Sequence, residues 1–272
     1  MRLLRSCSLV FVGFLAACGG SGSGSAKTGA LSGNWQIALQ STTYPESETG
    51  SGFLLQSGST VSGSVLLSGQ TASGTGTTVC QGVGTALGQA TGSNVTLAVS
   101  PAGQTVNLTG TSANNSTSMN GSYSILAAGC GQTEVGTWSA NQVDPLTGSF
   151  QATFVSNFTS GLTFQFTGTI TQGTNTGGST ATLSGTMTST NSPCFTTASI
   201  EGVVSGTSVV FNLFNAQGIG LGKYSGTMTT DATSVTGPYR FSNPSDPSVL
   251  AGCGGGDGGT AMFAVQSTPS TK

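Results

Sequence analysis

The segment Phe164-Gln-Phe-Thr-Gly-Thr-Ile170 alternates apolar and small polar residues. Because successive side chains of a β-strand point to opposite faces, Phe164, Phe166 and Ile170 share one face of such a strand. A strand that is apolar on one face is typical of antiparallel sheets, whose other face meets water. About eight segments of this kind occur in each half of the chain, separated by turns rich in Gly, Ser, Asn or Asp. The sequence therefore predicts an all-β protein.

The two halves of the chain repeat the same landmarks in the same order. Leu31-Ser-Gly-Asn-Trp-Gln-Ile37 matches Leu146-Thr-Gly-Ser-Phe-Gln-Ala152, and both halves later reach Ala-Gly-Cys-Gly, at 128–131 and 251–254. Consecutive strands with short turns favour an up-and-down meander, and closing the meander into a barrel removes its exposed edges. We expect two tandem antiparallel up-and-down meanders of about eight strands each, barrel-like, at residues 31–143 and 144–267. One continuous larger sheet is the alternative to two barrels.

The opening Gly33-Asn34-Trp35, followed by alternating strands, resembles the start of lipocalin and avidin barrels. The second half departs from that pattern, because Phe150 stands where the Trp would be. The resemblance implies an up-and-down closed barrel, and none of the binding residues of either family can be placed here. A transmembrane β-barrel is the alternative, but many segments are shorter than a spanning strand requires and interfacial aromatic residues are few.

Residues 1–17 have the order of parts expected of an export signal: basic residues, a short apolar run and small residues. They end in Leu15-Ala16-Ala17-Cys18, which resembles the lipobox of bacterial lipoproteins. That resemblance implies cleavage before Cys18 and acylation of this cysteine. Since Gly19 rather than Asp follows, it also implies delivery to an outer membrane, where the lipid anchor would be the chain's contact with the bilayer. The alternative is an ordinary secretory signal that happens to contain a cysteine.

The segments flanking the expected barrels are polar. Residues 18–30 begin with the lipidated cysteine and continue as a Gly/Ser-rich stretch of the kind that forms flexible linkers, and residues 268–272 form a polar tail. We expect the linker to let the folded part stand off the membrane.

Four of the six cysteines remain after Cys7 leaves with the signal and Cys18 receives lipid: Cys80, Cys130, Cys194 and Cys253. An even number in an exported protein predicts disulfides. Four cysteines allow three pairings, and the repeat favours Cys80 with Cys130 and Cys194 with Cys253, one bridge in each half. A four-thiolate metal site is the alternative, but the chain has no Cys-x-x-Cys pair.

The composition argues against several classes of function. The mature chain would hold only four basic side chains, Lys27, Lys223, Arg240 and Lys272, which are too scattered in sequence to form a nucleic-acid surface. The chain has no His, which removes the commonest metal ligand and general base. We therefore expect no nucleic-acid partner, no metal, no cofactor and no catalytic residues.

Acidic residues carry two further interpretations. Glu46 and Glu48 form a pair that could serve acid/base chemistry or calcium, and a solvated loop is the simpler explanation. Asp257 stands in the glycine-rich run of residues 252–259, which reads as a flexible loop beside a disulfide. Glu201, on an expected strand, could point into a barrel and orient a ligand, although an outward position is favoured.

These observations predict a non-enzymatic, lipid-anchored cell-envelope protein that binds a small apolar ligand or a surface partner. If a barrel were open, its lining would include Trp35, Phe166, Glu201 and Phe211. A structural or adhesive surface module and an inhibitor of a secreted enzyme are the alternative functions.

Overall fold

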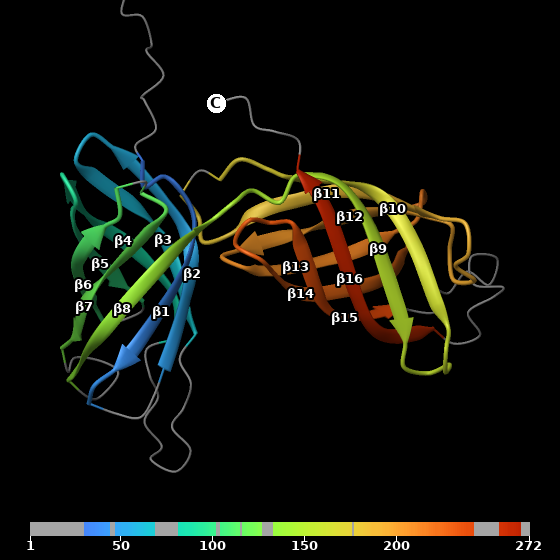
Figure 1. The fold of residues 1–272 in the computed structure, drawn as a ribbon, viewed down its shortest axis with the longest axis horizontal. Helices are drawn as coiled ribbons and strands as arrows, with labels where there is room; N and C mark the ends of the chain where they lie inside the picture. The colour runs from blue at the N-terminus through green and yellow to red at the C-terminus, as the bar shows by residue number, and fades with distance from the viewer. Residues whose placement is uncertain are drawn as a thin grey trace, which may run out of the picture.

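A computed structural model describes residues 30–43, 47–68, 81–101, 104–114, 116–126, 133–175, 177–241 and 256–267. These residues form sixteen β-strands in two closed antiparallel barrels and contain no helix. The barrels lie side by side along the long axis of the molecule (Figure 1). The predicted all-β fold with two tandem barrels is confirmed.

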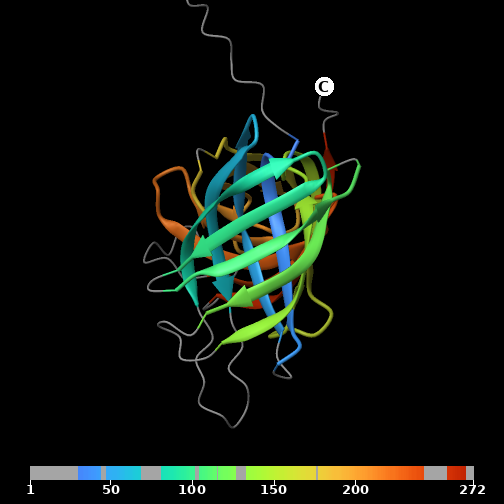
Figure 2. The same ribbon diagram turned by 90° about the vertical axis from the view of Figure 1, so that its left-hand side faces the viewer.

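The first barrel consists of eight strands in chain order. Its strands are β1 (Gly33–Ser41), β2 (Ser47–Ser57), β3 (Thr60–Ser68), β4 (Gly82–Thr91), β5 (Asn94–Ser100), β6 (Val106–Ser112), β7 (Ser118–Ile125) and β8 (Glu134–Val143). Each strand pairs with the next, and β1 also pairs with β8, which closes the sheet. The strands cross the barrel wall obliquely, as closure requires (Figure 2).

The second barrel repeats this topology. Its strands are β9 (Gly148–Ser156), β10 (Thr163–Gln172), β11 (Ala181–Ser189), β12 (Thr197–Ser205), β13 (Ser208–Phe214), β14 (Gly220–Met228), β15 (Ser234–Phe241) and β16 (Asp257–Ser267). Pairing of β16 with β9 closes it. Only residues 144–147 separate β8 from β9, at the predicted seam.

Alternation of side chains determines which face of each strand is buried. Phe164, Phe166 and Ile170 of β10 are each at most 3% exposed, whereas Gln165 and Thr167 between them face water. The predicted inward face is therefore confirmed. The same pattern along the other strands fills both barrels with apolar side chains.

The two interiors are packed with different side chains. The first barrel encloses mainly Leu, Val and Ile together with Trp35 and Trp138. The second is aromatic: the ring of Phe154 lies 4.9 to 5.6 Å, centroid to centroid, from the rings of Tyr239, Phe166, Phe241 and Phe263. Offset and edge-to-face ring pairs of this kind add to the stabilisation from burial. In both barrels, buried side chains occupy the interior.

The duplication extends to the register of individual residues. Tyr123 on β7 lies opposite Gly136 on β8, and Tyr239 on β15 lies opposite Gly259 on β16. In the first barrel a Cβ at Gly136 would lie 2.5 Å from Cε1 of Tyr123, so the ring needs glycine beneath it. The matching registers support the predicted internal repeat.

Candidate functional site

The candidate site lies where a hairpin of the second barrel meets the wall of the first. Ser205 pairs with Ser208, which leaves Gly206 and Thr207 as a two-residue turn between β12 and β13. Gly206 has a φ of +54°, a conformation that glycine adopts at little cost. A Cβ at this position would lie 2.3 Å from Oε1 of Gln36, so glycine also allows the close approach of the two barrels.

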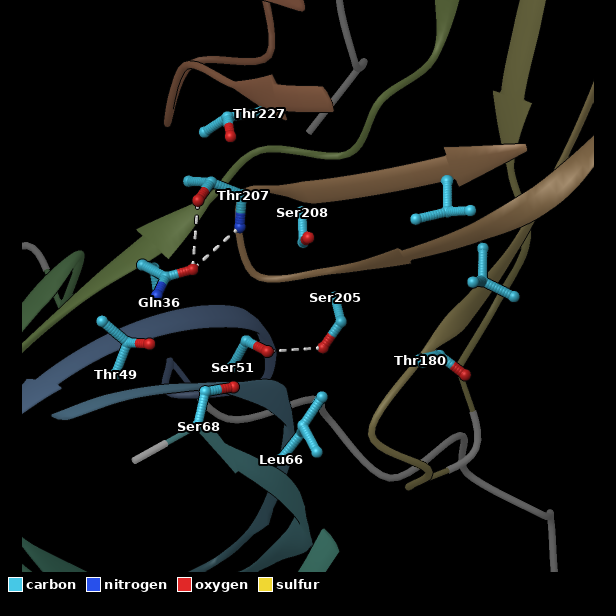
Figure 3. Close-up of a pocket in the computed structure, with 12 residues that line it drawn as sticks. Gln36, Thr49, Ser51, Leu66, Ser68, Thr180, Ser205, Thr207, Ser208 and Thr227 are labelled. Carbon is cyan, nitrogen blue, oxygen red and sulfur yellow. Dashed lines mark hydrogen bonds between the residues drawn. The ribbon is translucent and has the colours of Figure 1, made fainter. Parts of the chain in front are cut away.

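Three polar side chains of the first barrel hold this turn. Asn34 Nδ2 donates to the carbonyl of Gly206 at 2.8 Å, and the Gly206 N–H donates to Asn34 Oδ1 at 2.7 Å. Gln36 Oε1 accepts from the N–H and the hydroxyl of Thr207, at 3.0 and 3.1 Å. The hydroxyls of Ser51 and Ser205 lie 2.9 Å apart (Figure 3). The turn is thus hydrogen-bonded through both its backbone and its side chains.

An apolar anchor accompanies these hydrogen bonds. Phe53 points outward from β2, on the same wall as Ser51, yet it is only 5% exposed and packs in the hydrophobic cluster of the second barrel. The inward-facing Leu54 beside it belongs to the core of the first barrel. Burial of Phe53 outside its own barrel shows that the two barrels share an apolar contact.

A cleft of about 350 Å³ opens beside this contact. Its side chains come from β1, β2 and β3 of one barrel and from β12 to β14 and the end of the β10–β11 connection of the other (Figure 3). They are Gln36, Thr49, Ser51, Leu66, Ser68, Thr180, Val203, Ser205, Thr207, Ser208, Val210 and Thr227.

Hydroxyl groups dominate the lining of the cleft, and none of the described residues that line it is charged. Leu66, Val203 and Val210 supply an apolar surface, and the two valines are 40% and 46% exposed. Val203 and Val210 lie directly opposite each other across β12 and β13. Such a cleft can accept a neutral molecule with hydroxyl groups on one side and an apolar part on the other, but it offers no partner for a charge.

Buried carboxylates occur elsewhere, at one end of each barrel. Asp257 accepts hydrogen bonds from the hydroxyls of Tyr239 and Ser156, each at 2.6 Å. In the first barrel the Tyr123 hydroxyl donates to Glu134 in the equivalent position. Burial, reinforced by the neighbouring carboxylate, raises the pKa of both tyrosines, which therefore remain neutral donors. In each cluster a buried tyrosine hydroxyl thus holds a buried carboxylate.

Two interpretations of acidic residues from the sequence are wrong. Glu48 does not lie in a solvated loop: it belongs to β2, is 3% exposed and points inward on the side of Tyr123. Asp257 is the first residue of β16, not part of a flexible loop. In both cases the local sequence predicts a loop, but the residue lies in a strand and is buried beside a tyrosine. Glu46 lies outside the described residues.

The four residues named as a possible ligand lining do not come together. Trp35, Phe166 and Phe211 are at most 1% exposed and belong to the packed cores of two different barrels. The indole N–H of Trp35 donates to the carbonyl of Leu31 at 2.9 Å. Glu201 is exposed on the outer face of β12, so it does not line the barrel interior. None of the four lines the cleft.

Cys194 is buried and disulfide-bonded. Cys18, Cys80, Cys130 and Cys253 lie outside the described residues, as do the signal and the linker up to residue 29. The pairing of Cys194 with Cys253 and of Cys80 with Cys130 thus stays a prediction. So does lipidation of Cys18. Among the described residues no group of three or more Cys, Asp or Glu side chains could hold a metal ion, and no helix is long and apolar enough to cross a membrane.

No protein-family model and no curated protein sequence matches the chain. Among solved structures, kievitone hydratase from Nectria haematococca is similar with 12% identity and a TM-score of 0.24, over 88% of this chain and 90% of that one. Intact Ap-TbpB, with its N and C lobes, is similar with 10% identity and a TM-score of 0.22, over 80% of this chain and 52% of that one. Similarities at this level carry no information about function.

Proposed function

We propose that this chain is a non-enzymatic, lipid-anchored protein of the bacterial cell envelope, and that it binds its ligand in the cleft between the two barrels. The observation that carries the proposal is the cleft itself, formed by outward-facing residues of two barrels whose interiors are filled. Buried apolar side chains of the described residues occupy both interiors, where the sequence suggested a small apolar ligand. The proposal therefore places the ligand outside the barrels.

The lining residues point to a chemical class. Eight Ser and Thr hydroxyls and one Gln carboxamide can donate or accept hydrogen bonds, and three aliphatic side chains can contact an apolar part. A ligand with an uncharged hydroxyl-bearing ring and a short apolar chain matches both features. Alkyl glycosides are the simplest molecules of this class.

Titration with octyl glucoside, below its micelle concentration, tests this proposal. The full chain would be purified in a polyoxyethylene detergent, which has no sugar ring, and binding would be followed by saturation-transfer NMR. Val203→Asp and Val210→Asp place a carboxylate in the cleft, and because both positions are partly exposed the fold should tolerate them. We expect each variant to weaken binding about tenfold or more, since a charge would have to lose water on ligand binding.

Met262→Asp is the matched control. Met262 is 53% exposed on an outer barrel face and does not line the cleft. The same charge there should leave octyl glucoside binding unchanged. Equal weakening by Met262→Asp, or no binding by the wild-type chain, would refute the proposed site.

Anchoring is tested separately. With Cys18 acylated, the full chain should partition into the detergent phase of a Triton X-114 extraction. Cys18→Ala should move it to the aqueous phase without changing its circular dichroism spectrum. A Cys18→Ala variant that stays in the detergent phase would show that another feature holds the chain on the membrane.

A larger partner is the alternative, and exposed apolar residues beside the cleft favour it. Val83 on β4 lies directly opposite Leu66, and Val83 and Leu87 are 56% and 57% exposed. The apolar lining of the cleft thus continues along the outer face of β4. A surface or adhesive module would use this face, and Leu87→Asp would then abolish binding of the partner while leaving octyl glucoside binding intact.

A further inference from the structure

Two of the few basic residues of the chain lie side by side on the outer face of the second barrel. Lys223 of β14 and Arg240 of β15 are directly opposite each other in the register, and both side chains are exposed. Residues in this relation have Cβ atoms about 4.5 to 5.5 Å apart. The whole sequence contains only six Lys and Arg residues, so this juxtaposition concentrates a large share of its positive charge.

Neither cation is neutralised within the described part of the chain. Lys223 and Arg240 form no ion pair there. Glu201 belongs to the same lateral row of residues, but Asn212 of β13 stands between it and Lys223. Like charges directly opposite each other destabilise a sheet, so this pair costs stability unless an anion binds.

A groove of about 580 Å³ adjoins the pair. Arg240 lines it together with Phe158, Pro238 and three glycines of the β16 region, Gly256, Gly258 and Gly259, whereas Lys223 lies beside it on the neighbouring strand. Asp257 also lines the groove, but its carboxylate is buried and accepts hydrogen bonds from Tyr239 and Ser156. Phe158 is 80% exposed, and its Cε2 lies 3.1 Å from the position that a Cβ on Gly258 would occupy. The absence of a side chain at Gly258 therefore leaves room beneath the ring of Phe158, most of whose surface is exposed to solvent.

The first barrel shows what the same positions hold without such a site. By register, Asn107 and Ser124 correspond to Lys223 and Arg240, and Val135 corresponds to Gly258. Thr43 corresponds to Phe158, since the N–H of each donates to the hydroxyl of the serine two residues earlier at 3.1 Å. The two cations, the aromatic ring of Phe158 and the glycine beneath it thus occur together in the second barrel, and none of them has an equivalent in the first.

We infer that this groove, here called the basic groove, which is lined by Phe158, Pro238, Arg240 and Gly258 and flanked by Lys223, binds an anionic ligand that joins a phosphate group to an apolar or ring-shaped part. Lys223 and Arg240 hold the phosphate oxygens, and Phe158 and Pro238 contact the attached group. A soluble phosphate ester and the headgroup of an anionic phospholipid share this chemistry. The site is separate from the uncharged cleft between the barrels.

Calorimetric titration of the full chain in a neutral detergent tests the inference. Phenyl phosphate is the soluble probe, and phosphatidylglycerol dispersed in the same detergent is the lipid probe. We expect phenyl phosphate to bind more tightly than inorganic phosphate, because only the former can stack on Phe158, and we expect added salt to weaken both. Binding of phosphatidylglycerol but not of phenyl phosphate would assign the groove to the membrane surface.

The double variant Lys223→Asn and Arg240→Ser installs the residues of the first barrel at equivalent positions, so the fold should be kept. We expect affinity for the bound probe to fall about tenfold or more. The reciprocal variant, Asn107→Lys and Ser124→Arg in the Lys223→Asn and Arg240→Ser background, creates paired cations without the groove and should not restore binding. Binding of neither probe, an unchanged affinity in the first variant, or full restoration in the second would each overturn the inference.

Discussion

Tyr224 and Tyr239 face each other across β14 and β15, yet their hydroxyls meet different surroundings. Tyr239 donates to Asp257, whereas the Tyr224 hydroxyl has no hydrogen-bond partner among the described residues. Both side chains are at most 4% exposed. A buried hydroxyl without a partner destabilises a protein, while a satisfied one that holds a carboxylate stabilises it.

The same substitution should therefore have opposite effects at the two positions. Tyr239→Phe removes a donor from buried Asp257 and should lower the free energy of unfolding by about 1 to 3 kcal/mol. Tyr224→Phe removes only an unsatisfied hydroxyl and should be neutral or stabilise by up to about 1 kcal/mol. Urea denaturation followed by circular dichroism measures both. Equal destabilisation would contradict the assigned hydrogen bonds.

Alkaline pH should destabilise the fold. Burial raises the pKa of Tyr123, Tyr224 and Tyr239 above the ordinary value of 10.0. Above pH 10 the unfolded chain loses these protons while the folded chain keeps them, so the stabilisation is complete below pH 10 and declines as the pH rises. Each tyrosine contributes a slope of up to about 1.4 kcal/mol per pH unit.

Urea midpoints measured between pH 8 and about 11.5 would reveal this slope. In the Tyr224→Phe variant, the decline of the free energy of unfolding with pH should be shallower, because one titrating tyrosine is absent. A stability that does not change with pH above 10 would mean that the tyrosines ionise as easily in the folded state as in the unfolded state.

The hairpin that joins β12 to β13 shows how one element contributes to the site. Its counterpart in the first barrel is the turn that joins β4 to β5, where Gly92 has a φ of +60°. No described atom lies within 4 Å of a Cβ added at Gly92, whereas one added at Gly206 meets Gln36 and Ser51. The two turn glycines thus share a positive φ but differ in their surroundings.

Alanine at each glycine separates backbone strain from contact between the barrels. Gly92→Ala should cost about 1 to 2 kcal/mol, because a side chain at positive φ is strained. Gly206→Ala should lower the free energy of unfolding by the same amount and by a further contribution from the clash of the new Cβ with Gln36 Oε1. Thermal unfolding of both variants gives the comparison. If the two substitutions cost the same, the close approach of the barrels is not needed for stability.

Element-level features were the most predictable from sequence. Alternation in segments such as 164–170 identified the strands and their buried faces, and the repeat identified two matching halves of about eight strands each. The cleft was not predictable, because it depends on which outward-facing residues of one barrel meet the other. The Ser-Gly-Thr-Ser sequence at 205–208 signals a hairpin turn, but it does not reveal that Asn34, Gln36 and Ser51 receive it.

At the scale of the whole molecule, the contact between the barrels is asymmetric. The wall of the first barrel presents Asn34 opposite Phe53, and the same register positions of the second barrel hold Ser149 and Thr169. A head-to-tail contact of this type can in principle repeat without closing. Ser149 and Thr169 offer neither the carboxamide of Asn34 nor the apolar ring of Phe53. The corresponding surface of the second barrel therefore lacks the groups that bind the hairpin.

Replacing the first wall by the second tests which residues join the barrels. The double variant Asn34→Ser and Phe53→Thr should keep both barrels folded but release the hairpin. Hydrogen exchange would detect the release, because the N–H groups of Gly206 and Thr207 donate to Asn34 and Gln36. We expect exchange at these amides to accelerate strongly while amides in the barrel strands stay protected. Unchanged protection at residues 206 and 207 would contradict the described contact.

The central claim is that the ligand occupies the cleft between the barrels and not the interior of either one. Hydrogen exchange by mass spectrometry, on the full chain with and without octyl glucoside, tests it most directly. The account predicts added protection in peptides from the β12–β13 hairpin and from β2 and β3, with no change in β9 and β16, which lie on the far side of the second barrel's aromatic core. Added protection confined to strands away from the cleft, or no added protection at all, would contradict it.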